Sequence, residues 1–369
     1  MPKLLFAHQL RGIAALLIVI THYFGVYFGA QAVVAGVTVS PDLHLAAPDW
    51  VRHMDFPYFK GPFGVALFFL ISGFVIPFSL QKNSGAGFLL ARAWRIFPTY
   101  LACLGIGLLA VYLSSRYWQL PFLLDLHRLL MNALLVHNLA GVASLDTVNW
   151  TLAIELKFYV IAALCWRAML ESKPLVFAAI AAAVITLGLA LPSLAGLPYG
   201  HGLLAGLSTD LNYVLFMLIG TLFYQHYRKL ISLPRLAAGT ALLLAAFIAA
   251  WRFGTQRDQV PVLAEYYVYA VLVFALCYAA RGRFRPVRVL DFLADISYPL
   301  YVVHALAGYV LLKIAMHRGL DYGYAVCVVL AAVIALAWLL HKTIETTSSA
   351  YGKRLAAKLR RPAEEPATA

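Results

Sequence analysis

Charged residues are scarce in this chain of 369 residues. Asp, Glu, Lys and Arg make up 12% of it and hydrophobic residues 63%, whereas a soluble domain is nearer ~25% charged and ~45–50% apolar. This scarcity argues against a soluble globular protein and predicts a polytopic membrane protein. Long polar stretches are also lacking, so the length is better explained by one helical bundle than by several soluble domains.

Cysteine is rare as well. The four cysteines, Cys103, Cys165, Cys277 and Cys327, all fall inside apolar runs. None has the CxxC or Cys/His spacing of a metal or redox site. We therefore expect small core residues and no metal cofactor.

Acidic residues are fewer than basic ones, 16 against 29, and the formal net charge is +13. A strongly basic chain raises the question of nucleic-acid binding. Here, however, the basic residues cluster in short segments between apolar runs. That pattern favours positive-inside topology and contact with anionic lipids, with no nucleic-acid partner.

Ten apolar runs approach the ~20 residues that cross a bilayer. Their expected limits are 10–28, 62–80, 97–113, 150–168, 175–193, 211–227, 236–252, 263–280, 296–315 and 323–342. With these limits, 20 of the 29 Lys and Arg residues lie on the side of the N-terminus and 7 on the other side. We therefore expect an all-α polytopic membrane helical bundle of about ten transmembrane helices, with both termini cytoplasmic. The first run is interpreted as an uncleaved span and not as a signal peptide, because Arg11 interrupts it.

The segments between the runs suggest how the chain is organised. Residues 29–61 and 114–149 are expected to face outward, and loops this long often act as lids or binding loops. Residues 123–136 are compatible with an interfacial or re-entrant helix. The sequence divides into a membrane domain, 1–345, and a basic polar cytoplasmic tail, 346–369, that begins as a helix and ends in disorder.

The first run contains Arg11 and His22. Eleven positions at ~100° each end about 20° past three full turns, so both side chains lie on one face, roughly 16 Å apart along the axis. Ionisable residues inside a span usually face a cavity or a partner and mark a functional path. A snorkelling Arg and a His hydrogen-bonded to another helix remain the alternative.

Two further motifs place charges at or inside the membrane. Arg92 and Arg95 are neighbours on a helix and suit a phosphate-bearing ligand, because each guanidinium can pair with two oxyanion oxygens; topology anchoring is the equal alternative. Glu155 lies about five residues inside its expected span. Lys157 points ~200° away from it, so we expect its partner to be a His or Arg on another helix.

Near the C-terminus, Ser297, Tyr301 and His304 form one polar stripe at i, i+4 and i+7. Such a stripe either lines a cavity or holds the bundle together through interhelical hydrogen bonds. The run from Phe68 to Phe74, with its Ser-Gly pair, indicates close helix packing. Glu345 falls at the cytoplasmic boundary, where we expect it to be solvated.

Taken in order, these motifs resemble those of the membrane-bound acyltransferase 3 family, and the resemblance covers nearly the whole chain. The matching motifs are Arg11-x10-His22, FFLISGF from Phe68 to Phe74, an RxxR-type run at Arg92 and Arg95, WxLxxExxFY from Trp150 to Tyr159, and SYxxYxxH from Ser297 to His304. One departure follows the final acid: Thr346 and Thr347 follow Glu345, where the family commonly has one residue and then proline.

The resemblance implies an enzyme that transfers an acyl group, most often acetyl, from cytoplasmic acyl-CoA to a hydroxyl of an extracytoplasmic or lipid-linked carbohydrate such as a surface polysaccharide. It also implies an integral protein of the bacterial inner membrane. In our hypothesis His22 is the general base, and Glu155 orients an imidazole or binds the sugar. The arginines that hold the CoA phosphates would be Arg11, Arg92 and Arg95. The residues that line the substrate cavity would be Trp150, Tyr159, Ser297, Tyr301 and His304.

A transporter or flippase that exports a glycan precursor is the alternative function. Buried His, Glu and Arg also build proton relays and substrate paths. An exporter moves an unmodified sugar, whereas the enzyme consumes an acyl donor. The sequence leaves open the acceptor sugar and the hydroxyl position, the acyl group, the choice between direct transfer and an acyl-enzyme, and the oligomeric state.

Overall fold

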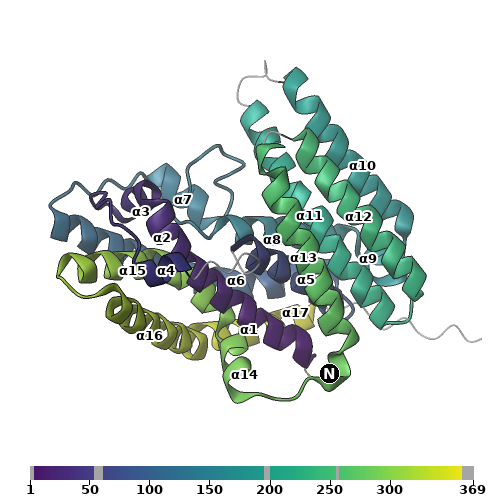
Figure 1. Cartoon of the computed structure of the whole chain (residues 1–369). Helices are drawn as coiled ribbons and strands as arrows, with labels where there is room; N and C mark the ends of the chain where they lie inside the picture. Colours follow the sequence, from purple (N-terminus) through teal and green to yellow (C-terminus); the bar gives the residue numbers. More distant parts are fainter. Residues whose placement is uncertain (1–3, 54–60, 195–199, 255–256, 360–369) are drawn as a thin grey trace, which may run out of the picture.

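The structure, a computed structural model, describes residues 4–53, 61–194, 200–254 and 257–359. Within these ranges the chain is helical and contains no β-strand (Figure 1). The longer helices are α1 (Leu5–Ile20), α5 (Gly61–Leu80), α6 (Gly85–Trp118), α8 (Trp150–Leu164), α10 (Pro174–Ala190), α11 (Gly200–Tyr227), α12 (Leu233–Phe253), α13 (Val260–Ala279), α15 (Ser297–His317), α16 (Tyr322–Leu340) and α17 (Thr346–Lys358). The shorter ones are α2 (Tyr27–Gly29), α3 (Gln31–Thr38), α4 (Asp49–His53), α7 (Leu126–Ala133), α9 (Trp166–Glu171) and α14 (Arg288–Asp295). Two π-helices, η1 (Thr21–Val26) and η5 (His341–Glu345), and three 3₁₀ turns, η2 (Leu191–Leu194), η3 (Arg257–Gln259) and η4 (Arg281–Arg283), complete the described chain.

Nine helical stretches among the described residues are long and apolar enough to cross a membrane. The expected all-α membrane bundle is therefore confirmed. The remaining expected span, 150–168, corresponds to α8 and α9, and α8 has only 15 residues, or about 22 Å of rise. It runs antiparallel to the first half of α6, because Asn149 Nδ2 reaches Tyr100 Oη at 3.4 Å and the Tyr159 ring lies 5.8 Å from that of Phe88.

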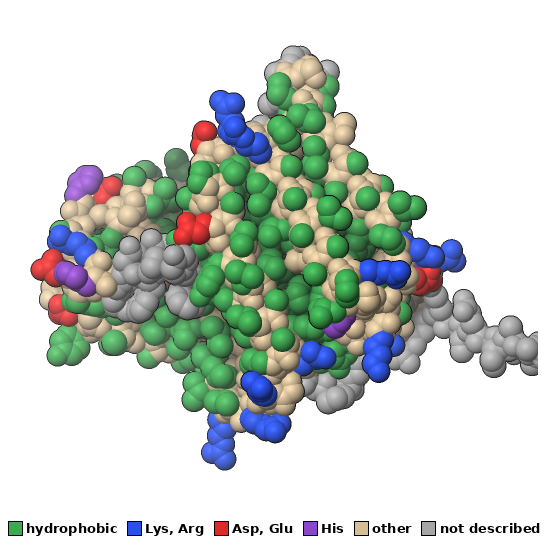
Figure 2. Space-filling model, turned by 45° about the vertical axis from the view of Figure 1, so that its right-hand side comes forward, with side chains coloured by type: hydrophobic (Ala, Val, Ile, Leu, Met, Phe, Trp, Pro, Cys, Tyr) green, Lys and Arg blue, Asp and Glu red, His purple; other side chains and the backbone are tan. Residues whose placement is uncertain are grey.

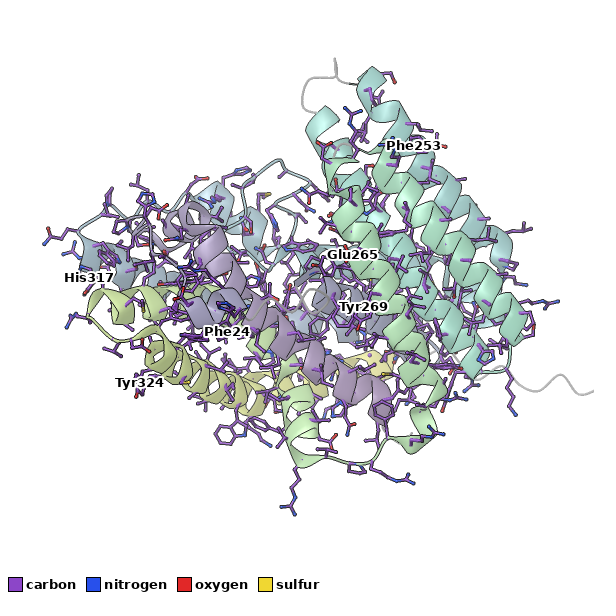
Figure 3. The ribbon with its side chains drawn as sticks, in the orientation of Figure 1. Phe24, Phe253, Glu265, Tyr269, His317 and Tyr324 are labelled. Carbon is purple, nitrogen blue, oxygen red and sulfur yellow. The ribbon has the colours of Figure 1, made fainter. Side chains whose placement is uncertain are left out.

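The long helices form two groups joined by α5 and α8. Helices α10, α11, α12 and α13 stand together in one group, and α1, α6, α15 and α16 belong to the other (Figure 1). Helix α5 contacts α1, α11 and α13, and α8 contacts α5, α6 and α11. Figure 3 labels Tyr269 on α13, whose ring lies 5.2 Å from Phe63 of α5. Because α5 is apolar on every side, it is the central helix of the bundle.

Basic and apolar side chains separate on the surface. In the face drawn in Figure 2, apolar side chains dominate the middle and several Lys and Arg side chains gather along the lower edge. The start of α1 is fixed near the basic segment before α14, since Gln9 donates to Arg285 O at 2.8 Å and to Asp291 Oδ1 at 3.1 Å. This distribution agrees with the expected positive-inside topology.

The segments outside the long helices are partly ordered. The expected outer loop 29–61 contains α3 and α4, and its residues 54–60 lie outside the described residues. The stretch 123–136 contains α7. The expected tail begins as α17, which packs along α6 with the Tyr351 ring 4.7 Å from Trp94. Its predicted disordered end, 360–369, lies outside the described residues.

Candidate active site

A cavity opens between α1, α5, α6, α8 and α15. It holds about 830 Å³ of empty space, part of it open to solvent. Seven of the ten residues singled out in the sequence line it: Arg11, Arg92, Arg95, Glu155, Tyr159, Ser297 and Tyr301. Apolar side chains of α5, such as Val65 and Phe68, line much of the remainder. A mostly apolar cavity with a few convergent polar groups is typical of a small-molecule site.

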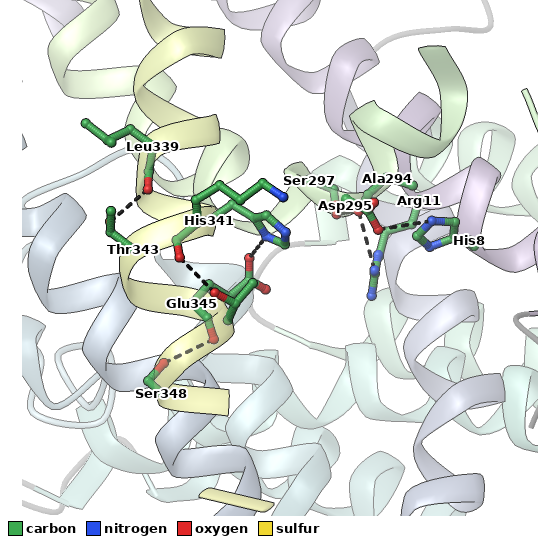
Figure 4. A network of polar contacts seen from close by, with 12 residues as sticks. His8, Arg11, Ala294, Asp295, Ser297, Leu339, His341, Thr343, Glu345 and Ser348 are labelled. Atoms are coloured by element: carbon green, nitrogen blue, oxygen red, sulfur yellow. Dashed lines mark hydrogen bonds and ion pairs between the residues drawn. The ribbon is translucent and has the colours of Figure 1, made fainter. Parts of the chain in front are cut away.

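The three arginines give the cavity its charge. Arg11 donates from Nη2 to Ala294 O at 3.4 Å (Figure 4), and within the described chain its buried Nε finds no hydrogen-bond partner. The guanidinium of Arg92 lies 5.4 Å from the Tyr159 ring centre and 5.5 Å from that of Phe88, both cation–π distances. A buried guanidinium N–H without a partner is costly, so this end of the cavity is suited to an anion.

Glu155 occupies the same cavity and has hydroxyl partners. Ser72 Oγ donates to Glu155 Oε1 at 2.9 Å, and Tyr159 Oη donates to the same oxygen at 2.6 Å. The expected Arg companions lie further away: Arg11 of α1 and Arg92 of α6 line the same cavity and interact with the charge of Glu155, but no hydrogen bond joins them to it among the described residues. Tyr159 stands one turn along the same face of α8, and Ser72 approaches from α5, so two hydroxyls reach the carboxylate first. Both use Oε1, which leaves Oε2 for a ligand.

Lys157 points to a different face of α8 from Glu155, as predicted, and has a separate partner. Its Nζ lies 2.7 Å from Asp210 Oδ2 on α11, and Asn138 also donates to that carboxylate. Both charged side chains are largely buried. Because a buried charge needs a partner, this ion pair ties α8 to α11 outside the cavity.

The polar stripe on α15 divides between two surroundings. Ser297 and Tyr301 line the cavity, whereas His304, one turn further on, is not among the lining residues. Tyr301 Oη donates to Val148 O at 2.9 Å and lies 2.6 Å from Thr151 Oγ1. The Tyr301 ring lies 6.1 Å from that of His304, so Tyr301 lies next to both the cavity and the histidine.

His22 lies beyond the outer end of the cavity. Its neighbour Thr21 packs beside Gly61, the first residue of α5, whereas the cavity is lined by residues further along α5. Arg11 and His22 lie on one helix face but are separated by a rise of roughly 16 Å, so only Arg11 reaches the cavity. The His22 ring lies 4.9 Å from that of His304, and its Nδ1 lies 2.6 Å from Tyr309 Oη. The structure thus pairs the two histidines.

Trp150 is the third candidate outside the cavity. Its ring lies 5.4 Å from that of Tyr213 on α11. Tyr213 in turn contacts Trp251 of α12, at 5.2 Å between ring centres. Trp150 therefore belongs to an aromatic cluster between the two helix groups.

Glu345 lies in surroundings that the sequence did not predict. It was expected to be solvated, but its side chain is only 9% exposed and Oε2 lies 2.8 Å from His341 Nδ1 (Figure 4). The two residues delimit the π-helix η5, which brings them onto one side of the chain. Four-residue spacing was the available signal for this pair.

Part of the second outer loop is buried against the histidine end of the bundle. Val148 and Asn149 are buried, and Asn149 Nδ2 donates to Asn132 Oδ1 at 2.9 Å. Burial raises the pKa of Asp146 to about 7, although the backbone N–H of Val148 donates to its carboxylate. Burial, and secondarily the charge of Lys157, lowers the pKa of His137 to about 4. This loop is therefore a packed element that contains two titratable side chains.

Metal ligands do not form a cluster in the described part of the chain: no group of three or more His, Cys, Asp or Glu is placed to hold an ion. The cavity residues that the sequence did not single out individually for the site include Ser72, Thr151 and Tyr298. All three stand inside matched motifs, so the motif was the available signal. Tyr309 lies beyond the cavity and in no matched motif. No sequence signal pointed to it, because its contact is with His22 on another helix.

Comparison with known proteins agrees with these motifs. Residues 5–342 match the family model described as an acyltransferase domain, Acyl_transf_3. Nodulation protein 10 of Rhizobium leguminosarum bv. viciae is 31% identical over 143 residues, which cover 32% of this chain and 36% of that protein. The match thus spans little more than a third of that relative's length. No solved structure matches this chain. The described residues include nine helices long and apolar enough for a multi-pass membrane protein. Because the family model covers residues 5–342 of the 369, the chain belongs to the acyltransferase 3 family.

Proposed function

We propose that this enzyme transfers a short acyl group, most often acetyl, from a cytoplasmic acyl-CoA to a hydroxyl of a carbohydrate on the opposite side of the membrane. The observation that carries the proposal is the joint placement of three arginines and Glu155 in one apolar cavity that ends next to a histidine pair. The arginine end suits a polyanionic nucleotide, and the apolar walls suit the pantetheine arm and its thioester.

The donor would lie along the cavity. Arg11, Arg92 and Arg95 would hold the CoA phosphates, with the unpaired Arg11 Nε as one available donor. Glu155 Oε2 would accept a hydrogen bond from an amide N–H of the pantetheine arm, a role that takes the place of the expected contact with an imidazole. The thioester would then reach the outer end of the cavity, near Tyr301.

The acceptor would approach from the histidine side. Its hydroxyl oxygen attacks the thioester carbonyl carbon, a C–O bond forms and the C–S bond breaks. His22 takes the hydroxyl proton, and the departing CoA thiolate takes up a proton to leave as the thiol. Tyr301 and His304 would shape the passage between the two substrates, whereas Trp150 would act at its periphery.

The nodulation relative does not define the acceptor, because it is matched over only part of its length. The carbohydrate is proposed because a sugar presents the neutral hydroxyl that this chemistry requires. Location in a bacterial inner membrane belongs to the same proposal, since acyl-CoA is a cytoplasmic metabolite.

The test is to supply radiolabelled acetyl-CoA to membranes with and without the protein and to measure label in the glycan fraction. Label that depends on the protein supports the enzyme. An unlabelled glycan that still requires the protein for export, with every short acyl-CoA tried, would instead identify an exporter.

A further inference from the structure

The imidazole of His22 is held by a side chain that none of the sequence motifs contains. Tyr309 of α15 is fully buried, and its Oη lies 2.6 Å from His22 Nδ1. The two rings are nearly parallel, at 17° with centres 5.9 Å apart. Tyr309 stands five residues beyond His304, where the stripe from Ser297 has ended. The contact therefore joins α15 to the π-helix η1 across the bundle.

The nearer imidazole, His304, does not hydrogen-bond to His22. Its Nδ1 lies 2.8 Å from Tyr301 O and 3.1 Å from Leu300 O. Carbonyl oxygens only accept, so Nδ1 carries the proton of the neutral ring and donates it within α15. The remaining nitrogen, Nε2, is buried and has no hydrogen-bond partner among the described residues. The contact between the two imidazoles is therefore one of ring edges, and the hydrogen bond to His22 comes from Tyr309.

The backbone around His22 is fixed by a separate contact. Tyr23, the next residue, donates from Oη to His304 O at 2.9 Å. It belongs to η1, and short π-helical segments inside longer helices are frequent at functional sites. The main chain beside His22 is therefore attached to α15, and the Tyr309 hydroxyl makes the hydrogen bond to the His22 ring.

We propose that Tyr309 is a positioning residue for His22: its phenolic oxygen accepts the Nδ1–H of the imidazole and so leaves the Nε2 lone pair free. The inference rests on the proposed function, in which His22 takes the acceptor proton. In that step the hydroxyl proton moves to Nε2 while Nδ1–H stays bound to Tyr309. The tyrosine thereby holds the imidazole in the tautomer that a base requires.

The kinetic test compares Tyr309→Phe with Tyr27→Phe. Phenylalanine keeps the buried ring and removes only the oxygen. We expect Tyr309→Phe to lower kcat about 10–100-fold and to leave KM for acetyl-CoA unchanged, since Tyr309 does not line the cavity. Tyr27 belongs to the same aromatic cluster, 6.4 Å from the Tyr309 ring, and its buried hydroxyl has no partner in the described chain. Its variant should retain wild-type kcat. An unchanged kcat in Tyr309→Phe, or an equal loss in Tyr27→Phe, would overturn the assignment.

A second measurement does not depend on turnover. Protein labelled with ¹⁵N-histidine in proteoliposomes would be examined by solid-state NMR, with the His22 signals identified by their loss in His22→Gln. The expected spectrum has Nδ1 protonated and Nε2 unprotonated in wild type and Tyr27→Phe, and a mixture of tautomers in Tyr309→Phe. A protonated Nε2 in the neutral wild-type ring would refute the inference. If wild type transfers no acetyl group, the proposed function fails, and this spectrum still decides the role of Tyr309.

Discussion

The arginines of the cavity are distinguished from surface arginines by what surrounds them. Arg92 stacks on two aromatic rings, and Arg11 has a buried Nε without a partner in the described chain. Guanidinium groups in such surroundings lose much of their hydration, so an incoming oxyanion replaces water at little cost. This is the physical basis for placing the nucleotide of the donor at this end.

Arg95→Lys should weaken donor binding, because an ammonium is a point charge and cannot form the two parallel hydrogen bonds of a guanidinium. We expect KM for acetyl-CoA to rise about 10-fold. The preference for acetyl-CoA over acetyl-dephospho-CoA should shrink if Arg95 contacts the 3′-phosphate. Arg116→Lys, at the other, exposed end of α6, is the matched control. An unchanged KM in Arg95→Lys would contradict the donor site.

Asp146 should make the stability of the outer loop depend on pH. Its native pKa of about 7 lies above the ordinary 3.8, so the native state binds this proton more tightly than the unfolded state. The stabilisation is complete below about pH 4 and is lost as the pH rises through 7. Asp146→Asn cannot ionise, and it should melt about 2–4 °C higher than wild type at pH 8.

At pH 5 the gain in melting temperature of Asp146→Asn over wild type should be less than half of the gain at pH 8, because only part of the stabilisation has been lost there. His137 contributes oppositely, because its lowered pKa gives stability above pH 6.5 that is lost as the pH falls through about 4. That contribution is common to both proteins and cancels in the comparison. Differential scanning fluorimetry in detergent at the two pH values measures both differences. A larger gain at pH 5 than at pH 8 would reverse the predicted sign.

The sequence predicted the site residues that share one face of a single helix. Ser297 and Tyr301 share a face because of their four-residue spacing, and both line the cavity. Relations between helices were predicted less completely: the arginines of α1 and α6 share the cavity with Glu155 as expected, but the hydrogen bond from Ser72 of α5 was not anticipated. The residue roles assigned here remain predictions, because they concern substrates.

At the scale of helices, α5 and α11 approach each other through two glycines. A Cβ on Gly73 would fall 1.9 Å from Met217 O, and one on Gly220 would fall 2.2 Å from Leu70 O. Thr221 Oγ1 also donates to Gly73 O at 3.1 Å. Small residues allow such backbone contact in membrane bundles, which explains the Ser-Gly pair within a bulky apolar run.

Gly73→Ala should force α5 away from α11 and destabilise the protein by about 1–3 kcal/mol, the range for overpacked cores. Because α5 also carries Ser72, activity should fall with stability. Gly105→Ala is the control, since a Cβ there meets nothing within 4 Å. Thermal melting in detergent compares the two variants. Equal melting temperatures for both would refute the close contact as a determinant of stability.

The helices were predictable to the extent that length and hydropathy define them. Nine expected spans recur as long apolar helices of the described chain, but α6 extends over 34 residues, twice the 17 expected. Its amphipathic ends are stabilised by tertiary contacts, such as that between Trp94 and Tyr351, which no window of hydropathy contains. Helix α8 is instead shorter than the span expected from hydropathy. It packs among α5, α6 and α11, so it need not cross the full bilayer.

In the whole molecule, the proposed function assigns a donor half and an acceptor half to the bundle. The cavity with three arginines occupies one half, and the pair of His22 and His304 lies beyond its outer end. Tyr301 adjoins both. Such a division suits a reaction whose two substrates arrive from opposite sides of a membrane.

The most direct test measures acetyl transfer in membrane vesicles of known orientation. Radiolabelled acetyl-CoA is added outside inside-out vesicles, so that it meets the cytoplasmic face, and label in glycan is counted. Wild type and His53→Ala, a variant of an exposed outer-loop histidine, should incorporate label, whereas His22→Ala should incorporate at least about 100-fold less. Right-side-out vesicles should incorporate none. Normal incorporation by His22→Ala, or equal incorporation in both orientations, would contradict the account.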